Sequence, residues 1–236
     1  MLNSSRRRVG RSLSIQRNAL ETNEAIANKN KRLFGKAFVI NFLSSPGSGK
    51  TSLLESIVPI LKSDGFKPAV IEGDVETDLD KKRIDELDIP AYQIVTNGTC
   101  HLDAKMVNGA LNNLNRKDAD IIFIENVGNL VCPTSFNLGE DIKAVVLSVT
   151  EGDDKPLKYP AAFYKSKVMI INKIDLLPFL DSSITKIKEN ALSVNKDLAI
   201  FETFCKKNEK AGNIENNGLS DFISFMENNI NSKVSK

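Results

Sequence analysis

The sequence predicts an α/β fold in which a largely parallel sheet is covered by helices on both faces. Short β-branched apolar runs alternate with helix-like segments from residue 37 onward, which is typical of parallel sheets. The 236 residues are also enough to bury one full core. Strands are expected at 37–43, 68–72, 91–96, 120–125, 143–149, 167–172 and 198–202. Helices are expected at about 50–63, 77–87, 103–115, 156–164, 182–192 and 218–229.

A glycine-rich turn joins the first expected strand to the first expected helix. It reads Ser-Ser-Pro-Gly-Ser-Gly-Lys-Thr over residues 44–51, and this strand–turn–helix order predicts the phosphate-binding loop of a P-loop NTPase. Glycines let backbone N–H groups surround an anion, and the helix N-terminus adds its dipole. Lys50 would meet the outer phosphates, and the Thr51 hydroxyl would hold Mg²⁺. The residues expected to bind nucleotide here are Gly47, Ser48, Gly49, Lys50, Thr51 and Ser52.

A second nucleotide motif follows the sixth expected strand. Asn172, Lys173 and Asp175 form the Asn-Lys-x-Asp pattern with which P-loop GTPases recognise guanine. Asp175 would accept hydrogen bonds from the base N1–H and its exocyclic amine, while Lys173 packs along the ring. Adenine lacks this donor pair and would leave the carboxylate unpaired, so the pattern predicts GTP rather than ATP.

Carboxylates at two strand ends are candidates for Mg²⁺ binding and catalysis. Asp74 follows the second strand and Glu125 ends the fourth, and either could hold a water on Mg²⁺ or position the attacking water. Gly128 would let a backbone N–H meet the γ-phosphate. No arginine finger is evident, so slow hydrolysis that a partner or dimerisation accelerates is expected.

The N-terminal segment differs in charge from the rest of the chain. Residues 1–36 carry nine Lys and Arg against two Glu, a net +7, which leaves −5 for residues 37–236 because the whole chain is +2. We expect a basic N-terminal extension over 1–36, solvated and partly helical, and a P-loop GTPase domain over 37–236. No nucleic-acid binding is expected, because no aromatic residue precedes Phe34, although a docking role stays open. Apolar runs are too short to span a membrane, and three cysteines without a disulfide pattern suit a cytoplasmic protein.

Cysteine and histidine suggest a second chemistry. The one histidine, His101, adjoins Cys100, and Cys132 follows the Glu125 strand. Thiolate and imidazole suit Zn²⁺ and Ni²⁺ better than Mg²⁺, and both segments leave the carboxyl ends of strands. Three ligands do not close a tetrahedral structural site, so an open site or one shared by two subunits is expected. Residue types alone also permit an ordinary buried cysteine and a chance Cys-His pair.

Taken together, these motifs resemble those of the HypB family, the GTPases that serve nickel insertion in nickel–iron hydrogenase maturation. Residues 125–133 (Glu-Asn-Val-Gly-Asn-Leu-Val-Cys-Pro) together with the Cys100-His101 pair make the resemblance specific, because few other GTPases combine such a pair with this cysteine-bearing segment. The serine at position 44, where the strict P-loop motif has glycine, is similar to the family's usual loop. The other segments that carry the resemblance are 44–51, 100–104, 151–160 and 172–175.

The resemblance implies a nucleotide-dependent homodimer whose interface holds nickel or zinc on Cys100, His101 and Cys132. It also implies two partners, a small nickel/zinc metallochaperone and the hydrogenase large subunit precursor. Three alternatives stay open: delivery to another nickel enzyme such as urease or a carbon-monoxide-type dehydrogenase, a metal-binding module with nucleotide-gated dimerisation and little catalysis, and a regulatory GTPase without metal. The segment of Asp153 and Asp154 could reach the nucleotide or the partner subunit, or one of these aspartates could cap a helix with Pro156 near its first position, and both interpretations could hold at once.

Overall fold

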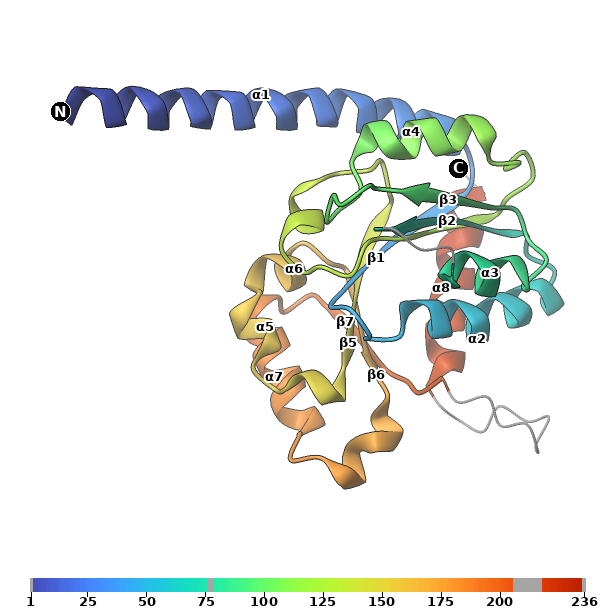
Figure 1. The fold of residues 1–236 in the computed structure, drawn as a ribbon. Coiled ribbons are helices and arrows are strands. Elements are labelled where there is room, and N and C mark those ends of the chain that lie inside the picture. Colours follow the sequence, from blue (N-terminus) through green and yellow to red (C-terminus); the bar gives the residue numbers. More distant parts are fainter. Residues whose placement is uncertain (1, 76–78, 206–217, 235–236) are drawn as a thin grey trace.

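The computed structural model describes residues 2–75, 79–205 and 218–234, with side chains from residue 18 onward except those of 79 and 80. Seven strands form one sheet in the order β3-β2-β4-β1-β5-β6-β7, and every pairing is parallel (Figure 1). The predicted fold class is therefore confirmed. The strands are β1 (Phe38–Ser44), β2 (Pro68–Asp74), β3 (Ala91–Val95), β4 (Ile121–Glu125), β5 (Ile142–Ser148), β6 (Val168–Asn172) and β7 (Ala199–Glu202).

Helices cover both faces of this sheet. One face carries α2 (Lys50–Ser63), α3 (Leu79–Asp85) and α8 (Leu219–Val234). The other carries α1 (Leu2–Phe34) and α4 (Ala104–Asn113) over one half, and α6 (Pro160–Tyr164) and α7 (Ile184–Val194) over the other. Short elements complete the described chain: α5 (Lys155–Lys158) and the 3₁₀ turns η1 (Cys132–Ser135), η2 (Val149–Glu151) and η3 (Ile174–Phe179).

The central strands are apolar because they are buried on both sides. Every residue of β1, β4 and β6 is buried, as expected for parallel strands between two helical layers. Phe42 and Phe123 stack between β1 and β4 with ring centroids 5.8 Å apart, and Phe222 of α8 meets Phe42 edge-on. Each such buried ring contributes about 1.5–3 kcal/mol of transfer free energy.

The single helix expected over 156–164 is wrong. The structure has α5 and α6 instead, separated at Tyr159, whose φ of −124° and ψ of 51° are not helical. Pro160 explains the break, because its ring lacks an N–H and disfavours helical backbone in the preceding residue.

The N-terminal extension is a helix that belongs partly to the body of the protein. The first part of α1 runs away from the sheet, whereas its last part lies along α4 (Figure 1). Asn23, Ala27, Asn30 and Phe34 are buried, so the expectation of a solvated extension is wrong for this part. The division at residue 36 stays a prediction. Across the described residues, no helix combines the length and apolarity that crossing a membrane requires.

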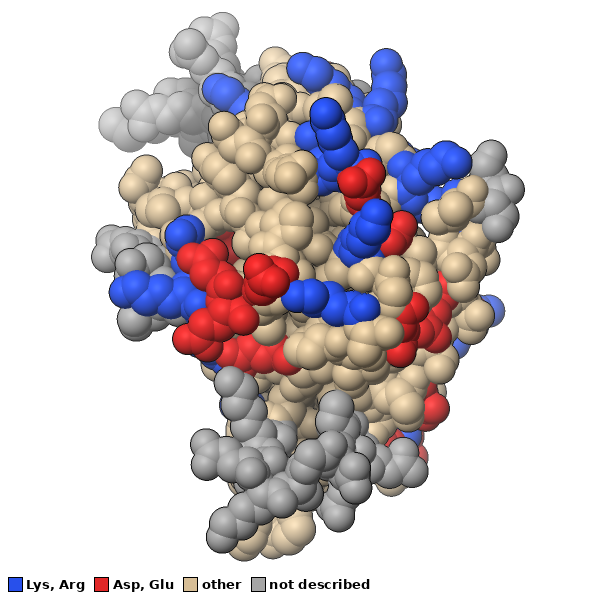
Figure 2. Space-filling model, turned by 90° about the vertical axis from the view of Figure 1, so that its right-hand side faces the viewer, with Lys and Arg blue, Asp and Glu red and all other residues tan. Residues whose placement is uncertain are grey.

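Surface charges on the α2, α3 and α8 face are of both signs. Figure 2 shows Asp and Glu interspersed with Lys and Arg there. Arg83 of α3 pairs with Glu55 of α2 at 2.9 Å, and Lys81 pairs with Asp85 at 3.0 Å. Exposed pairs such as Lys81 and Asp85 contribute at most about 1 kcal/mol, so packing rather than charge holds this face.

Candidate functional site

The turn between β1 and α2 has the geometry of a phosphate-binding loop. Gly47 and Gly49 have φ angles of 75° and 97°, in the left-handed region that favours glycine. A Cβ on Gly49 would lie 2.5 Å from Nδ2 of Asn172, so a larger residue would displace that amide as well as strain the backbone. Lys50 begins α2, is 8% exposed, and donates from Nζ to Oγ of Ser44 at 2.8 Å. The loop thus presents a lysine and a helix N-terminus to the same space.

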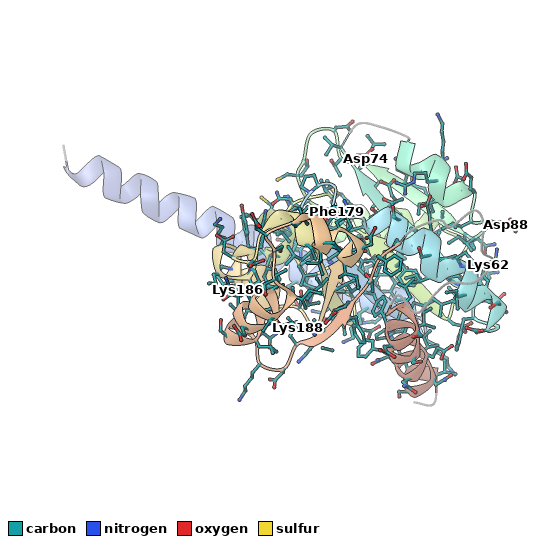
Figure 3. The ribbon with its side chains drawn as sticks, turned by 90° about the horizontal axis from the view of Figure 1, so that it is seen from below. Lys62, Asp74, Asp88, Phe179, Lys186 and Lys188 are labelled. Carbon is teal, nitrogen blue, oxygen red and sulfur yellow. The ribbon has the colours of Figure 1, made fainter. Side chains whose placement is uncertain are left out.

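A pocket of about 440 Å³ opens over this loop at the carboxyl ends of β1, β2 and β4. Asp74 lies at the end of β2 (Figure 3), and Thr51 donates to Oε1 of Glu125 at 2.7 Å. The structure therefore brings all three residues expected to hold Mg²⁺ to one cavity. The other predicted residues lining it are Gly47, Gly49, Lys50, Ser52, Gly128 and Lys173.

Glu72 is a pocket residue that the sequence analysis did not select. It is 3% exposed and stands beside Glu125 in the register of β2 and β4. Two neighbouring buried carboxylates favour a cation, because like charges in a poorly solvated place are costly. A usable signal was present: Glu72 lies two residues before Asp74, and alternate strand residues share a face.

Gly128 brings the segment after β4 against the phosphate loop. A Cβ at this position would lie 2.9 Å from Cα of Pro46, which is backbone and cannot give way. The close approach explains the glycine. Because Gly128 is this close to Pro46, a shift of the phosphate loop would press on the segment 126–132.

The first two residues of the Asn-Lys-x-Asp motif bond directly to the phosphate loop, and only Lys173 of the motif also lines the pocket. Asn172 donates from Nδ2 to Ser48 O at 2.9 Å, and Lys173, with φ of 62°, donates from Nζ to Gly47 O at 2.6 Å. Asp175 is half-buried on η3 and does not line the phosphate pocket. Cys205 contacts Asn172, and burial raises the pKa of its thiol to about 11. The region 201–217, expected from the resemblance to depart from the usual Ser/Gly-rich guanine-contacting loop, is described only as far as Cys205, and its remainder, 206–217, lies outside the described residues.

Two further residues support the phosphate loop from the segment after β5. Glu151 accepts from Ser48 Oγ at 2.6 Å, and Lys155 donates to Ser45 Oγ at 3.3 Å while pairing with Glu151 at 3.5 Å. Sequence analysis missed both roles, because the contacts span more than 100 residues.

The helix-capping interpretation of Asp153 and Asp154 is partly wrong. Asp154 occupies the N-cap position of α5, with Pro156 in the first turn, but its side chain makes no capping hydrogen bond. Asp153 instead accepts from Ser182 Oγ at 2.7 Å and from Ser183 N at 3.0 Å, just before α7. It therefore ties the loop after β5 to the start of α7.

Cys100, His101 and Cys132 form a cluster beside the nucleotide pocket. One potential ligand atom from each lies within 4.8 Å of the others, although 31 residues separate His101 from Cys132. Cys100 and His101 leave β3 for α4, and Cys132 begins η1 after β4. The His101 ring stacks on Phe136 with centroids 4.2 Å apart, which fixes its orientation.

A metal ion and protons compete for the ligand atoms of this cluster, because a thiol binds a metal ion as the thiolate. Burial lowers the pKa of His101, partly opposed by the Asp103 carboxylate, so the imidazole is neutral and able to ligate at neutral pH. A hydrogen bond with Cys100 and then burial raise the pKa of the Cys132 thiol. A soft divalent ion would therefore displace thiol protons when it binds.

Asn126 connects the two sites. It lines the nucleotide pocket, is 1% exposed, and accepts from Leu102 N at 3.1 Å and Val127 N at 3.0 Å. Leu102 directly follows His101, so one buried side chain touches the pocket and holds the backbone beside a potential metal ligand. Asn129, three residues on, donates to Cys100 O at 3.3 Å.

Comparisons with known proteins agree with this geometry. The model of the CobW/HypB/UreG nucleotide-binding domain matches residues 38–202. Hydrogenase maturation factor HypB of Rhizobium leguminosarum bv. viciae is 46% identical over 219 residues, which cover 92% of this chain and 70% of that protein. The chain belongs to the HypB family. The matched range runs from the first residue of β1 to the last of β7, so it contains both sites.

Two more HypB proteins extend the comparison. The hydrogenase/urease maturation factor HypB of Helicobacter hepaticus is 37% identical over 219 residues, which cover 90% of this chain and 87% of that protein. The crystal structure of HypB from Helicobacter pylori in complex with nickel has a TM-score of 0.80 and 37% identity. That superposition covers 89% of this chain and 96% of the other.

Proposed function

We propose that this chain is a GTP-hydrolysing metallochaperone that couples nucleotide state to nickel delivery during hydrogenase maturation. One observation carries the proposal: the phosphate pocket and the Cys100, His101 and Cys132 cluster share the segment after β4, and Asn126 belongs to both surroundings. Relatives named hydrogenase maturation factors, and a similar structure in complex with nickel, support the choice of cargo and client.

In this proposal the chain's own residues prepare γ-phosphoryl transfer to water. Lys50 and the loop N–H groups would offset the charge that develops on the phosphate oxygens. Glu125 or Asp74 would position the water that attacks phosphorus as the bond to GDP breaks. Mg²⁺ fits the oxygen donors Thr51, Asp74 and Glu125, and it would neutralise phosphate charge there. Because no described arginine other than Arg83 lines the pocket, and Arg83 is paired with Glu55, we expect slow turnover by the monomer.

The base specificity rests on Asp175. Its position on η3, one turn beyond the buried Asn172, is suited to the guanine end of a nucleotide whose phosphates occupy the pocket. Asp175→Asn should lower the preference for GTP over ATP by about 100-fold or more, because the carboxylate would no longer accept from two donors. Competition of both nucleotides against fluorescent GDP measures this, and an unchanged preference would remove guanine recognition from the proposal.

The metal would be cargo, nickel in the cell with zinc as a second occupant. Cys100 is exposed and the neighbouring Val131 is 60% exposed, so the cluster opens outward beside an apolar residue. This arrangement supports a nucleotide-dependent homodimer in which two clusters meet. Free thiols this close also need a reducing compartment, which supports the cytosol. A small nickel/zinc metallochaperone would supply the ion, and the hydrogenase large subunit precursor would receive it.

The deciding experiment measures nickel and zinc binding to the protein without nucleotide, with GDP, and with a non-hydrolysable GTP analogue, with mass determined in each state. The proposal expects metal affinity or stoichiometry to change with nucleotide, and a dimer in the GTP-analogue state. Metal binding that ignores the nucleotide would contradict the coupling. Nucleotide-gated dimerisation with negligible hydrolysis would instead favour a metal-binding module.

Urease maturation is a second candidate client. The Helicobacter hepaticus relative, named a hydrogenase/urease maturation factor, favours keeping it. Nickel transfer from the loaded protein to purified hydrogenase and urease precursors, side by side, separates the two clients.

A further inference from the structure

Two asparagines near the end of α1 are buried and fully engaged with distant backbone. Asn30 is 0% exposed and donates from Nδ2 to Ala104 O at 2.8 Å and to Leu138 O at 3.0 Å. Asn23 is 7% exposed, donates to Asn137 O at 2.8 Å, and accepts from Ala104 N at 2.8 Å. Buried amides are costly unless every polar atom is satisfied, so these contacts are specific rather than incidental.

The backbone that these asparagines hold belongs to the segments carrying the metal ligands. Ala104 lies three residues after His101, and α1 engages both its N–H and its carbonyl. Asn137 and Leu138 follow Phe136, whose ring stacks on His101. They also lie in the same segment as Cys132.

Gly139 shows how closely this second segment approaches α1. A Cβ at that position would lie 2.5 Å from Ala27 O. The helix α1 therefore contacts two loops, one between β3 and α4 and one between β4 and β5. The residues that line the phosphate pocket make none of these contacts, and no described residue of α1 is among them.

We propose that Asn23 and Asn30 are positioning residues for the metal cluster. By joining the loop of Cys100 and His101 to the loop of Cys132, α1 fixes the spacing of the three ligands. The inference rests on the proposed function, because it assumes that the cluster binds metal. Its physical basis is that groups which orient metal ligands from outside the coordination sphere raise metal affinity.

The first test replaces each asparagine by an apolar residue. Asn30→Leu removes, at similar volume, the two bonds donated to Ala104 O and Leu138 O and the one accepted from Asn108 Nδ2. Asn23→Ala removes the contacts nearer the surface, where folding is less at risk. Each should weaken binding of Ni²⁺, Zn²⁺ and Co²⁺ about tenfold and shift the cobalt absorption bands, which report ligand geometry. GDP affinity should not change. Asn28→Leu is the matched control, because Asn28 is exposed on the same helix and bonds only within it.

A second measurement uses the unmodified protein, so it does not depend on a variant folding. Coupling between two sites is reciprocal, so binding Zn²⁺ should slow hydrogen exchange in residues 23–34 of α1. The end of α2, residues 58–63, should exchange at an unchanged rate. Wild-type metal affinity in both variants, or α1 exchange that ignores Zn²⁺, overturns the inference and leaves the proposed function standing. Wild-type protein that binds no metal overturns both.

Discussion

The side chains expected to bind nucleotide are buried and bond to one another, whereas the proposed metal ligands lie on loops that other parts of the chain hold in place. Lys50, Thr51 and Glu125 are at most 8% exposed and linked by hydrogen bonds through the loop and β4. Cys100 is exposed, and Asn129 donates to its carbonyl. The next two residues are held by other side chains: Phe136 stacks on His101, and Asn126 accepts from Leu102 N. The pocket side chains therefore hold one another, whereas the spacing of the cluster depends on contacts from the segment after β4 and from α1.

The largest effect expected is loss of nucleotide binding in Lys50→Ala. Two charge-assisted bonds to phosphate would disappear, so affinity for GTP should fall about 1,000-fold or more. Metal binding without nucleotide should survive, which would sharpen the contrast between the two regions. Lys62→Ala is the control, since Lys62 lies away from Asp74 and the pocket and bonds to Leu87 O and Asp88 O (Figure 3). Calorimetry with a non-hydrolysable GTP analogue and with Ni²⁺ measures both affinities.

Cys132→Ser tests the other region. Loss of one of three ligands should weaken nickel and zinc binding by about 100-fold or more, because a direct ligand contributes more than the outer groups that orient it, whose loss costs about 10- to 100-fold. GDP affinity should stay at the wild-type value. Cys205→Ser removes a thiol outside the cluster and should leave metal affinity unaltered. Equal metal loss in both variants would place the site elsewhere.

Metal affinity should fall as the pH is lowered. The pKa of the Cys132 thiol is raised, so protons compete with metal throughout the neutral range, and the competition weakens only as pH rises toward that pKa. Each displaced proton changes the apparent affinity about tenfold per pH unit. His101, whose pKa is lowered, adds competition only at the acidic end. Titrations with Zn²⁺ from pH 6 to 9 check the slope, and a flat profile would exclude thiol ligands.

The smallest effect on either binding reaction itself should come from Asn126→Ala. Both binding reactions should survive, but the ratio of nickel affinities in the GTP-analogue and GDP states should move toward one from the about 5- to 150-fold typical of coupled sites. Unpaired Leu102 and Val127 amides should also cost about 1–3 kcal/mol each in unfolding free energy. Asn113→Ala, on the exposed end of α4, is the control. A preserved ratio would mean that the two regions communicate by another route.

Much of the fold could be predicted because strands buried on both faces of the sheet appear in the sequence as continuous apolar runs. All seven strands were expected within two residues of their observed bounds, and the order strand, glycine turn, helix located the phosphate loop. The split at Tyr159 was missed although Pro160 was visible, since helical periodicity across it outweighed one proline. Asn23 and Asn30 gave no usable signal, because a polar residue in an amphipathic pattern is normally assigned to the solvent face.

The sequence by itself determined the family, the parallel α/β architecture and the chemical character of both sites, because these depend on local patterns and residue types. Only the tertiary structure decided which groups meet. Strand order brings β3 and β4 to either side of β2, and their loops carry Cys100, His101 and Cys132 to within 4.8 Å. The same crossovers place Asn126 between pocket and cluster and set α1 against the ligand loops. Such contacts join residues far apart in the chain, so no local pattern records them.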